Sequence, residues 1–281
     1  MKVCIVGWYH HKNLPFLHRA FQILGWQEVS FSAAQIVFDG SQYIPIHNFP
    51  EKKFICGPHF SVFPDGNSNF DNRHHNAIYI HPSQFCVDIW AKELNYRALP
   101  VRVFAFGVDT DRFNSGTDPK TEVFVYHKRR KPEELKLITD FLTEKNIKYH
   151  LFDYVKHYEE EDYLSVLKRA KYGIWLGTHE SQGFGLEEAL SCNVPLLVWN
   201  VTRMSQEAGQ EQTYAHIKTP ATTIAYWSEN CGEFFYQAEE FLPTYDKFIA
   251  KLEQYTPRQY ILDNLSMEKR AQALLQLCEN M

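Results

Sequence analysis

The sequence predicts an α/β fold in which parallel sheets are covered by helices. After Gly107, short apolar runs of strand length alternate with longer segments whose apolar residues recur at helical spacing. Near the N-terminus, residues 2–7 are apolar apart from Lys2, as in a strand buried on both faces. Such alternation favours parallel strands, and ligands of parallel sheets bind beyond the carboxyl ends of the strands.

The N-terminal part begins with one clear strand and one clear helix. We expect the strand over 2–7, ending in a glycine before a polar turn, and the helix over 14–25. Turn-rich loops separate the shorter runs that follow. These runs predict strands over 35–38, 53–56 and 78–80.

The C-terminal part has a more regular order of elements. We expect strands over 122–126, 148–152, 172–176 and 196–199, with helices over 132–145, 160–171 and 185–192 between them. From Gly232 onward the sequence predicts mostly helix, ending in 266–281. In that last segment Leu274, Leu275 and Cys278 form an apolar stripe.

Composition narrows the class of protein. The 281 residues, 44% of them hydrophobic, are enough for one large core or two modest ones. The 29 basic and 34 acidic residues give a net charge of −5, so we expect no nucleic-acid partner. Six cysteines without CxxC spacing indicate reduced thiols and a cytoplasmic location. No apolar run approaches the roughly 20 residues of a transmembrane segment, so none is expected.

Residues 177–200 carry the strongest functional signal. Gly183 and Gly185 open a predicted helix, where glycine permits close approach and the first N–H groups favour an anion such as phosphate. Glu180 and Glu188 flank this loop, and carboxylates repel phosphate but accept hydrogen bonds from neutral hydroxyls. Phosphate and hydroxyls together indicate a nucleotide sugar.

This segment resembles the E-x7-E signature of GT-B glycosyltransferases of the glycogen synthase and bacterial mannosyltransferase type. In that family the first carboxylate contacts the donor sugar, the loop amides bind the diphosphate and the second carboxylate holds the ribose. The resemblance implies the first role for Glu180 and the last for Glu188. The diphosphate would lie on Gly183, Phe184, Gly185 and Leu186.

Two further segments resemble the same family. VRVFAFGVDTDRF at 101–113 is similar to its interdomain pattern, through Gly107, Val108, Asp109 and Phe113. Residues 77–93 resemble the last strand and helix of its first domain. The implied architecture is a compact GT-B fold of two Rossmann-like domains. It has an acceptor-binding domain over 1–105, a nucleotide-sugar-binding domain over 106–265, and a C-terminal helix over 266–281 that crosses back to the N-terminal domain.

A basic run, Lys128 to Lys131, follows the predicted strand 122–126. At this point family members have an arginine and a lysine that bind the donor diphosphate. Their attraction to the diphosphate increases as the leaving group gains charge, which favours the transition state. We favour Lys128 and Arg130 for this role. The alternative is a solvated basic turn ahead of the acidic helix start at Glu133 and Glu134.

Other candidates lie at predicted strand ends. His179 either touches the donor or caps its strand, and Gly7 lets the backbone approach the ligand. For a reaction that inverts the sugar, His10 is the candidate general base toward an acceptor hydroxyl and, with Glu180, completes the predicted catalytic residues. Retention and inversion of the sugar configuration both stay open. His11, Asp39 and His59 are weaker candidates for the same base.

No metal site or cofactor is expected. Asp109-Thr110-Asp111 has the DxD form of a metal motif, but it lies within the interdomain pattern and no third oxygen ligand is suggested nearby. The histidine pairs 10–11 and 74–75 lack zinc spacing.

The sequence therefore predicts a metal-independent glycosyltransferase. It would move a hexosyl or pentosyl group from a nucleotide-diphosphate sugar to a hydroxyl of a glycan or small-molecule acceptor. Two alternatives stay open. One is a nucleotide-sugar epimerase of the same fold, which needs no acceptor. The other is a non-catalytic nucleotide-binding protein, against which stands the absence of a GxGxxG fingerprint.

Overall fold

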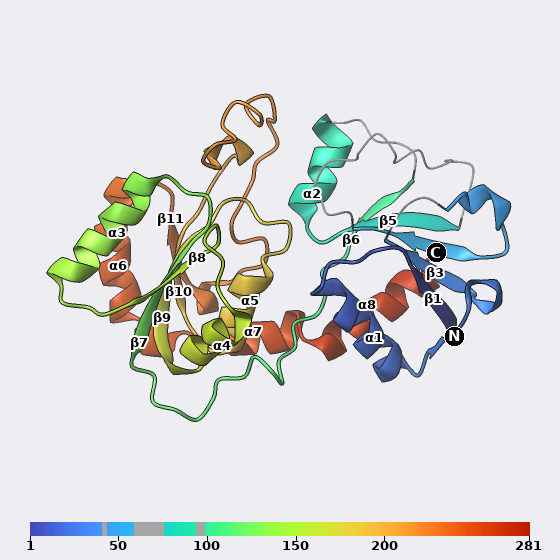
Figure 1. Cartoon of the computed structure of the whole chain (residues 1–281), viewed down its shortest axis with the longest axis horizontal. Coiled ribbons are helices and arrows are strands. Elements are labelled where there is room, and N and C mark those ends of the chain that lie inside the picture. The colour runs from blue at the N-terminus through green and yellow to red at the C-terminus, as the bar shows by residue number, and fades with distance from the viewer. Residues whose placement is uncertain (41–43, 59–75, 94–98) are drawn as a thin grey trace. The chain divides into compact units, whose positions relative to one another are not determined.

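The computed structural model describes the chain except residues 41–43, 59–75 and 94–98. The chain folds into two compact units (Figure 1). The N-terminal unit combines Met1–Gly107 with Leu265–Met281, and the C-terminal unit is Val108–Asn264. Each unit contains its own sheet, in which the paired strands run parallel.

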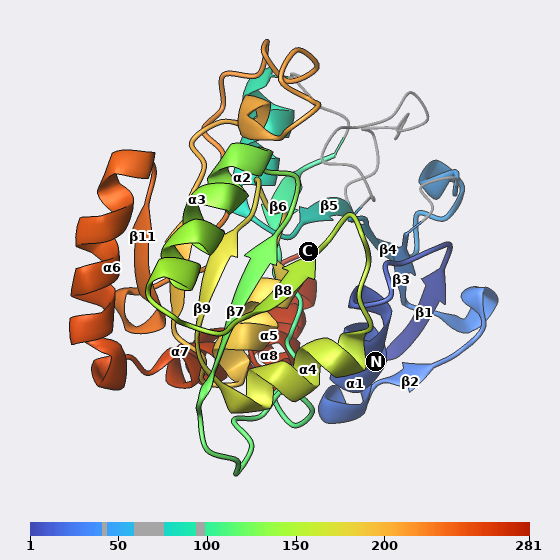
Figure 2. The same ribbon diagram turned by 60° about the vertical axis from the view of Figure 1, so that its left-hand side comes forward.

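The N-terminal unit is built on a six-stranded sheet of order β2-β1-β3-β4-β5-β6. Figure 2 shows β1, β3 and β4 side by side. Apolar residues dominate β3 and β5, and every residue of both strands is buried. The strands are β1 (Lys2–Val6), β2 (Gln27–Glu28), β3 (Ile36–Asp39), β4 (Lys53–Cys56), β5 (Ala77–His81) and β6 (Val101–Val103). The helices are α1 (Asn13–Leu24) and α2 (Gln84–Asp88), which continues as a π-helix over Ile89–Glu93.

The last helix, α8 (Met267–Glu279), belongs to the N-terminal unit and packs against α1. Its Arg270 Nε donates to the Ala105 carbonyl at 2.8 Å, and Lys53 Nζ donates to the Cys278 carbonyl at 3.0 Å. Gly107 permits this packing, because an added Cβ would lie 2.9 Å from the Cα of Met267. The glycine of the 101–113 segment therefore has a packing role.

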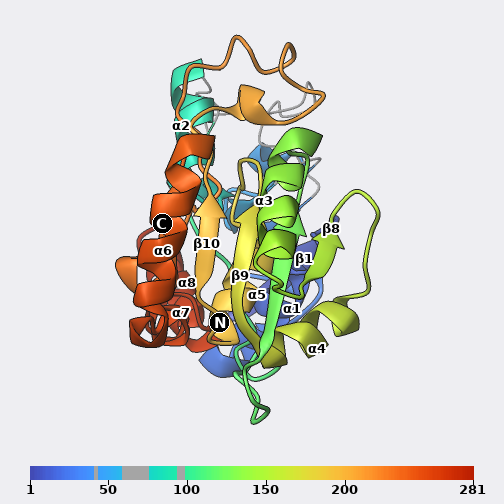
Figure 3. The ribbon, with the colours of Figure 1, turned by 90° about the vertical axis from the view of Figure 1, so that its left-hand side faces the viewer.

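The C-terminal unit is built on a five-stranded sheet of order β11-β10-β9-β7-β8. Figure 3 labels β10, β9 and β8 of this sheet. Its helices lie on both faces of the sheet. The strands are β7 (Glu122–His127), β8 (His150–Asp153), β9 (Ala170–Leu176), β10 (Leu196–Trp199) and β11 (Gly232–Phe235). The helices are α3 (Pro132–Glu144), α4 (Glu160–Arg169), α5 (Phe184–Ser191), α6 (Phe241–Ala250) and α7 (Pro257–Asn264).

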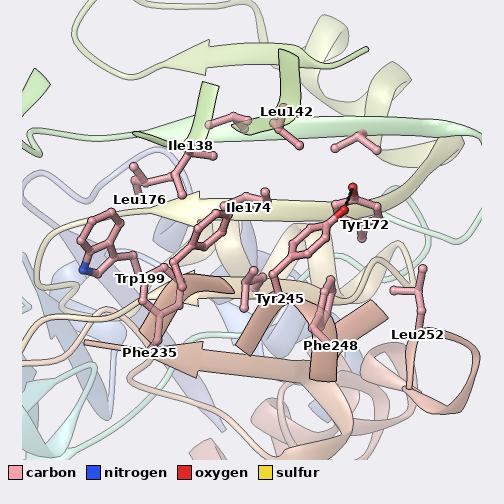
Figure 4. Close-up of a cluster of buried hydrophobic side chains, with 14 of the residues drawn as sticks. Ile138, Leu142, Tyr172, Ile174, Leu176, Trp199, Phe235, Tyr245, Phe248 and Leu252 are labelled. Carbon is pink, nitrogen blue, oxygen red and sulfur yellow. Dashed lines mark hydrogen bonds between the residues drawn. The ribbon is translucent and has the colours of Figure 1, made fainter. Parts of the chain in front are cut away.

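Alternate residues of the central strands face two different cores. Val125 of β7 and Ile174 of β9 pack with apolar side chains of α3 and α6 in the cluster shown in Figure 4. On the other face, Phe124 makes edge contacts with Tyr163 and Trp175, and Trp175 stacks on Tyr126. Burying each large apolar side chain stabilises the folded state by roughly 1.5–3 kcal/mol. Strands with apolar residues on both faces are therefore most stable in the middle of the sheet, where both faces are covered.

Three short strands differ from the sequence prediction. β11 forms where mostly helix was expected, β6 lies within the presumed interdomain segment, and β2 was not expected. Consequently β5 is not the last strand of its sheet, because β6 follows it along the chain. At Gly232 in β11 an added Cβ would lie 2.0 Å from the Leu196 carbonyl oxygen, so close strand contact selects glycine here.

Candidate functional site

A charged cluster lies where β7 and β9 end. Lys128 directly follows β7, and its N–H donates to the carbonyl of Leu176, the last residue of β9, at 2.9 Å. Glu180 lies four residues beyond that strand end, and its backbone N–H donates to the Thr222 carbonyl at 3.0 Å. Because β7 and β9 are parallel neighbours, their carboxyl ends bring these side chains to one edge of the sheet.

Lys128 and Glu180 form a close ion pair. The ammonium Nζ lies 2.8 Å from Oε1 and 2.9 Å from Oε2 of Glu180, so both carboxylate oxygens accept from it. The two side chains are only 18% and 11% exposed. Hydrogen bonds to charged groups contribute about 1.5–3 kcal/mol each. The Lys128 ammonium also lies 4.7 Å from the centre of the Tyr154 ring.

A second ion pair, which sequence reasoning missed, lies beside the first. Arg129 Nη1 donates to Oε1 of Glu207 at 2.8 Å, and this hydrogen bond raises the pKa of Arg129. The Glu207 side chain is buried, whereas that of Arg129 is 51% exposed. The Arg129 guanidinium lies 5.8 Å from the same Tyr154 ring, so both cations approach one aromatic side chain.

Glu207 belongs to the long connection between β10 and β11, which is orange in Figure 3 and lies beyond the arrowheads of β9 and β10. The connection is fixed at its base, because the Asn200 side-chain oxygen accepts from the Thr223 N–H at 2.8 Å. The Ala208 N–H also donates to the Arg129 carbonyl at 2.8 Å. No motif marks Glu207, since its place depends on how this irregular segment folds back.

His179 lies between the two ion pairs and is uncharged at neutral pH. Burial, together with the charges of Lys128 and Arg129, lowers the pKa of His179 to about 4. Oε2 of Glu207 lies 3.6 Å from His179 Nδ1, and the same carboxylate is shared with Arg129. The ring also makes an edge contact with Tyr214. The structure therefore places His179 next to Glu180 as a neutral imidazole.

Arg130 points into the protein rather than toward this cluster. Its side chain is 1% exposed and forms a bidentate pair with Glu134 at 2.8 and 2.7 Å. Its Nη1 donates to the carbonyls of Gly177 and Trp199 at 3.2 and 2.9 Å. The predicted donor-binding role of Arg130 is not favoured by this geometry, because its guanidinium already joins β7, β9, β10 and α3. Arg129 is the exposed cation next to Lys128.

The predicted glycine loop forms the start of α5. Gly183 is the N-cap residue and has φ +96°, a conformation that favours glycine. An added Cβ there would meet only ordinary contacts at 3.5 Å or more, so the backbone angle, not space, selects glycine. Phe184, Gly185 and Leu186 follow as the first helical residues. The N–H groups at the start of a helix favour an anion. The Gly185 carbonyl accepts from Tyr163 at 2.9 Å.

Two successive carboxylates follow on α5, and both are buried. Glu188, predicted to hold the ribose, is 4% exposed, and Glu187 is 1% exposed and accepts from Gln182 Nε2 at 2.9 Å. Burial raises the pKa of Tyr158 to about 12, and the charges of Glu188 and Glu180 act in the same direction. Tyr158, which no sequence motif indicated, therefore lies within electrostatic reach of both predicted donor carboxylates.

The remaining candidates belong to the N-terminal unit. Gly7 follows β1 with φ +75°, and His10 is half-buried, with Nδ1 accepting from the Lys12 N–H at 3.2 Å. The His10 and His11 rings lie 4.1 Å apart. Asp39 is buried at the end of β3, and His59 lies outside the described residues.

Among the residues that the structure describes, no three His, Cys, Asp or Glu side chains gather in a way that could hold a metal ion. In the DxD segment, Asp109 Oδ1 accepts from the Arg112 N–H at 3.0 Å and so stabilises a turn. The six cysteines are buried and not joined in disulfides. Within the described ranges, no helix is both long and apolar enough to span a membrane.

Comparison with known proteins identifies the fold. The chain matches no protein-family model and no curated protein sequence. Among solved structures, a glycosyltransferase from Rickettsia africae is 11% identical with a TM-score of 0.60, over 99% of this chain and 97% of that one. Sucrose-phosphate synthase from Thermosynechococcus elongatus is 12% identical with a TM-score of 0.55, over 99% and 98% of the two chains.

A third similar structure is the pneumococcal O-GlcNAc transferase GtfA in complex with UDP and GlcNAc. It is 10% identical with a TM-score of 0.53, over 97% of this chain and 60% of that one. At such identities the likeness establishes the fold. The chain has the GT-B fold, and the predicted α/β architecture with two Rossmann-like domains is confirmed.

Proposed function

We propose that this protein is a glycosyltransferase that moves a sugar from a nucleotide-diphosphate sugar to a hydroxyl of a glycan or small-molecule acceptor. One observation carries the proposal. Lys128, Glu180 and the glycine-initiated helix α5 all lie beyond the carboxyl ends of adjacent parallel strands. That edge is where parallel sheets bind ligands, and the cluster combines groups for phosphate with groups for hydroxyls. The GT-B fold supports this interpretation.

In this proposal the diphosphate lies on the N–H groups of Gly183 to Leu186 and on Lys128. Arg129 provides the second cation, the role predicted for Arg130, because its guanidinium is half exposed. These donors and cations act most strongly when the departing diphosphate gains charge, which favours the transition state. Charge neutralisation is assigned to these side chains, and the proposal includes no metal ion or cofactor.

The carboxylates recognise the neutral parts of the donor. Glu180 accepts hydrogen bonds from the sugar hydroxyls, with His179 beside it, and Glu188 accepts them from the ribose. We assign acceptor binding to the N-terminal unit, with His10 as the base for the acceptor hydroxyl in an inverting transfer and Gly7 giving backbone access. The buried free thiols support a cytoplasmic protein.

Titration calorimetry with a panel of nucleotide sugars tests the proposal. The panel begins with UDP sugars, because GtfA was solved with UDP, and includes hexose and pentose donors. At least one donor should bind, and Glu188→Ala and Lys128→Ala should each weaken it by about tenfold or more. Asp140→Asn, in an exposed pair on α3, is the matched control and should change nothing.

Unchanged affinity in both site variants would refute the assignment of the site. Product analysis then separates the possible activities. Transfer should appear only when an acceptor is added, whereas isomerised donor without acceptor would indicate an epimerase.

A further inference from the structure

The Lys128–Glu180 ion pair occupies two groups that the proposed donor needs. Both oxygens of Glu180 accept from the Lys128 ammonium, although one group is assigned to sugar hydroxyls and the other to phosphate. We infer that this pair makes the site select nucleotide sugars over free nucleoside diphosphates. The inference rests on the proposed function and adds a specificity that neither residue would provide alone.

The cost of separating the pair is the physical basis. The side chains are 18% and 11% exposed, so a carboxylate left without its counter-ion would be poorly solvated. Two of the three Lys128 N–H donors are directed at Glu180, and a free diphosphate that draws the ammonium toward itself leaves Glu180 in that state. A nucleotide sugar brings hydroxyls that donate to Glu180 and replace the lost hydrogen bonds. The same contact with Lys128 is therefore more favourable for the intact donor.

The neighbouring ion pair, Arg129 with Glu207, does not have to separate when a phosphate binds. Arg129 is 51% exposed and has five N–H donors in a fork, with Nη1 directed at Glu207. A phosphate can approach its exposed edge while Glu207 keeps its hydrogen bond. The discrimination therefore depends on Lys128 and Glu180, and Arg129 attracts any diphosphate.

The selection also favours product release. Once the sugar has left, its hydroxyls no longer occupy Glu180, and the carboxylate competes again with the diphosphate for Lys128. The ion pair seen in the structure is then the state to which the site returns after each transfer.

The test compares a nucleoside diphosphate with its own sugar derivative. Calorimetry would use UDP with UDP-glucose, GDP with GDP-mannose and ADP with ADP-glucose, continuing with whichever pair wild type binds. Wild type should bind the sugar derivative about tenfold more tightly than the diphosphate. In Glu180→Gln the diphosphate should bind about tenfold more tightly than in wild type and the sugar derivative more weakly, so that the preference is lost or inverted.

Glu180→Gln could strengthen diphosphate binding in two ways: by freeing the Lys128 ammonium, or by removing a carboxylate that repels the diphosphate. A double variant separates these two causes. If the gain comes from a freed Lys128, adding Glu180→Gln to Lys128→Met should change diphosphate affinity by less than about twofold. A gain that persists without Lys128 would overturn the inference. Asp140→Asn controls for the change of net charge. Thermal unfolding checks folding, and Glu180→Asp, which shortens the reach to Nζ, replaces Glu180→Gln if that variant unfolds.

The two possible failures are distinguishable. Binding of neither member of any pair by wild type would overturn the proposed function and this inference with it. Binding of both members with equal affinity, or an unchanged preference in Glu180→Gln, would overturn the inference alone.

Discussion

Two groups of charges at the end of β7 have similar chemistry and opposite surroundings. The Arg130 group, Arg130 with Glu134, is turned inward, and its cation also binds two carbonyls. The Lys128 group, Lys128 and Arg129 with Glu180 and Glu207, lies beyond the strand ends, and Arg129 reaches solvent. Cations within three consecutive positions therefore differ in burial and in partners. A basic residue next to a site is a ligand candidate only if its donors are not already used by the fold.

The largest expected effect tests the structural role of the Arg130 group. Arg130→Met should lower the free energy of unfolding by about 3–5 kcal/mol, because Glu134 loses its counter-ion and the carbonyls of Gly177 and Trp199 lose the guanidinium donor. Urea unfolding measures the change. Lys136→Met, whose side chain is 72% exposed on the same helix, is the control. A loss no larger than that of the control would end the distinction between the two groups.

The next effect concerns pH and the Lys128 group. The pKa of His179 is lowered to about 4 by burial and by Lys128 and Arg129, against an unfolded value of about 6.5. Between these values the unfolded chain binds a proton that the folded one does not, so stability is complete above about pH 6.5 and falls as pH decreases toward 4. The full loss is about 3 kcal/mol.

Urea unfolding at about pH 7.5 and pH 5 should therefore show a smaller pH dependence in His179→Gln than in wild type. His216→Gln, at an exposed position of the same connection, should behave as wild type does. Equal pH dependence in His179→Gln and wild type would show that the imidazole is not held in its neutral form.

A smaller effect tests the backbone at the start of α5. Gly183→Ala should cost about 1–2 kcal/mol, because φ +96° is unfavourable for a residue with a Cβ even where space exists. Gly185→Ala is the matched control. Its Cβ would meet Trp175 at 3.4 Å, an ordinary contact, and the change should stay within about 1 kcal/mol. Similar losses in both variants would show that the turn does not require glycine.

The smallest expected effect on stability is that of breaking an exposed ion pair. Asp140→Asn breaks an exposed pair with Lys136 on α3 and should change stability by less than about 0.5 kcal/mol. Thermal unfolding measures this value. A change as large as that of Arg130→Met would mean that burial does not separate structural ion pairs from superficial ones in this unit.

Much of the fold was predictable because buried strands and amphipathic helices leave periodic apolar patterns. β4 and β10 were predicted with the bounds that the structure gives them, and most other elements within a few residues. β11 was missed because four residues at a sheet edge carry no periodic signal of their own. Its neighbours, rather than its composition, make it a strand.

The candidate site could be predicted only where its residues belong to one continuous segment of the chain. Glu180 and Gly183 belong to one strand-loop-helix segment, so their spacing is informative. The choice between Arg129 and Arg130 could not be predicted from spacing. Arg129 has φ +49°, and at this turn the side chain of Arg130 is buried while that of Arg129 is half exposed. Glu207 reaches the cluster from a distant connection, which a spacing argument within one segment does not detect.

The discontinuous N-terminal unit has a consequence for synthesis on the ribosome. Val108–Asn264 is contiguous and can complete its sheet as soon as it emerges. Residues 1–107 precede this segment but lack α8, so the side of α1 that α8 covers stays exposed until residues 265–281 have been made. Residues 1–107 are thus made before residues 108–264 but complete their packing after them.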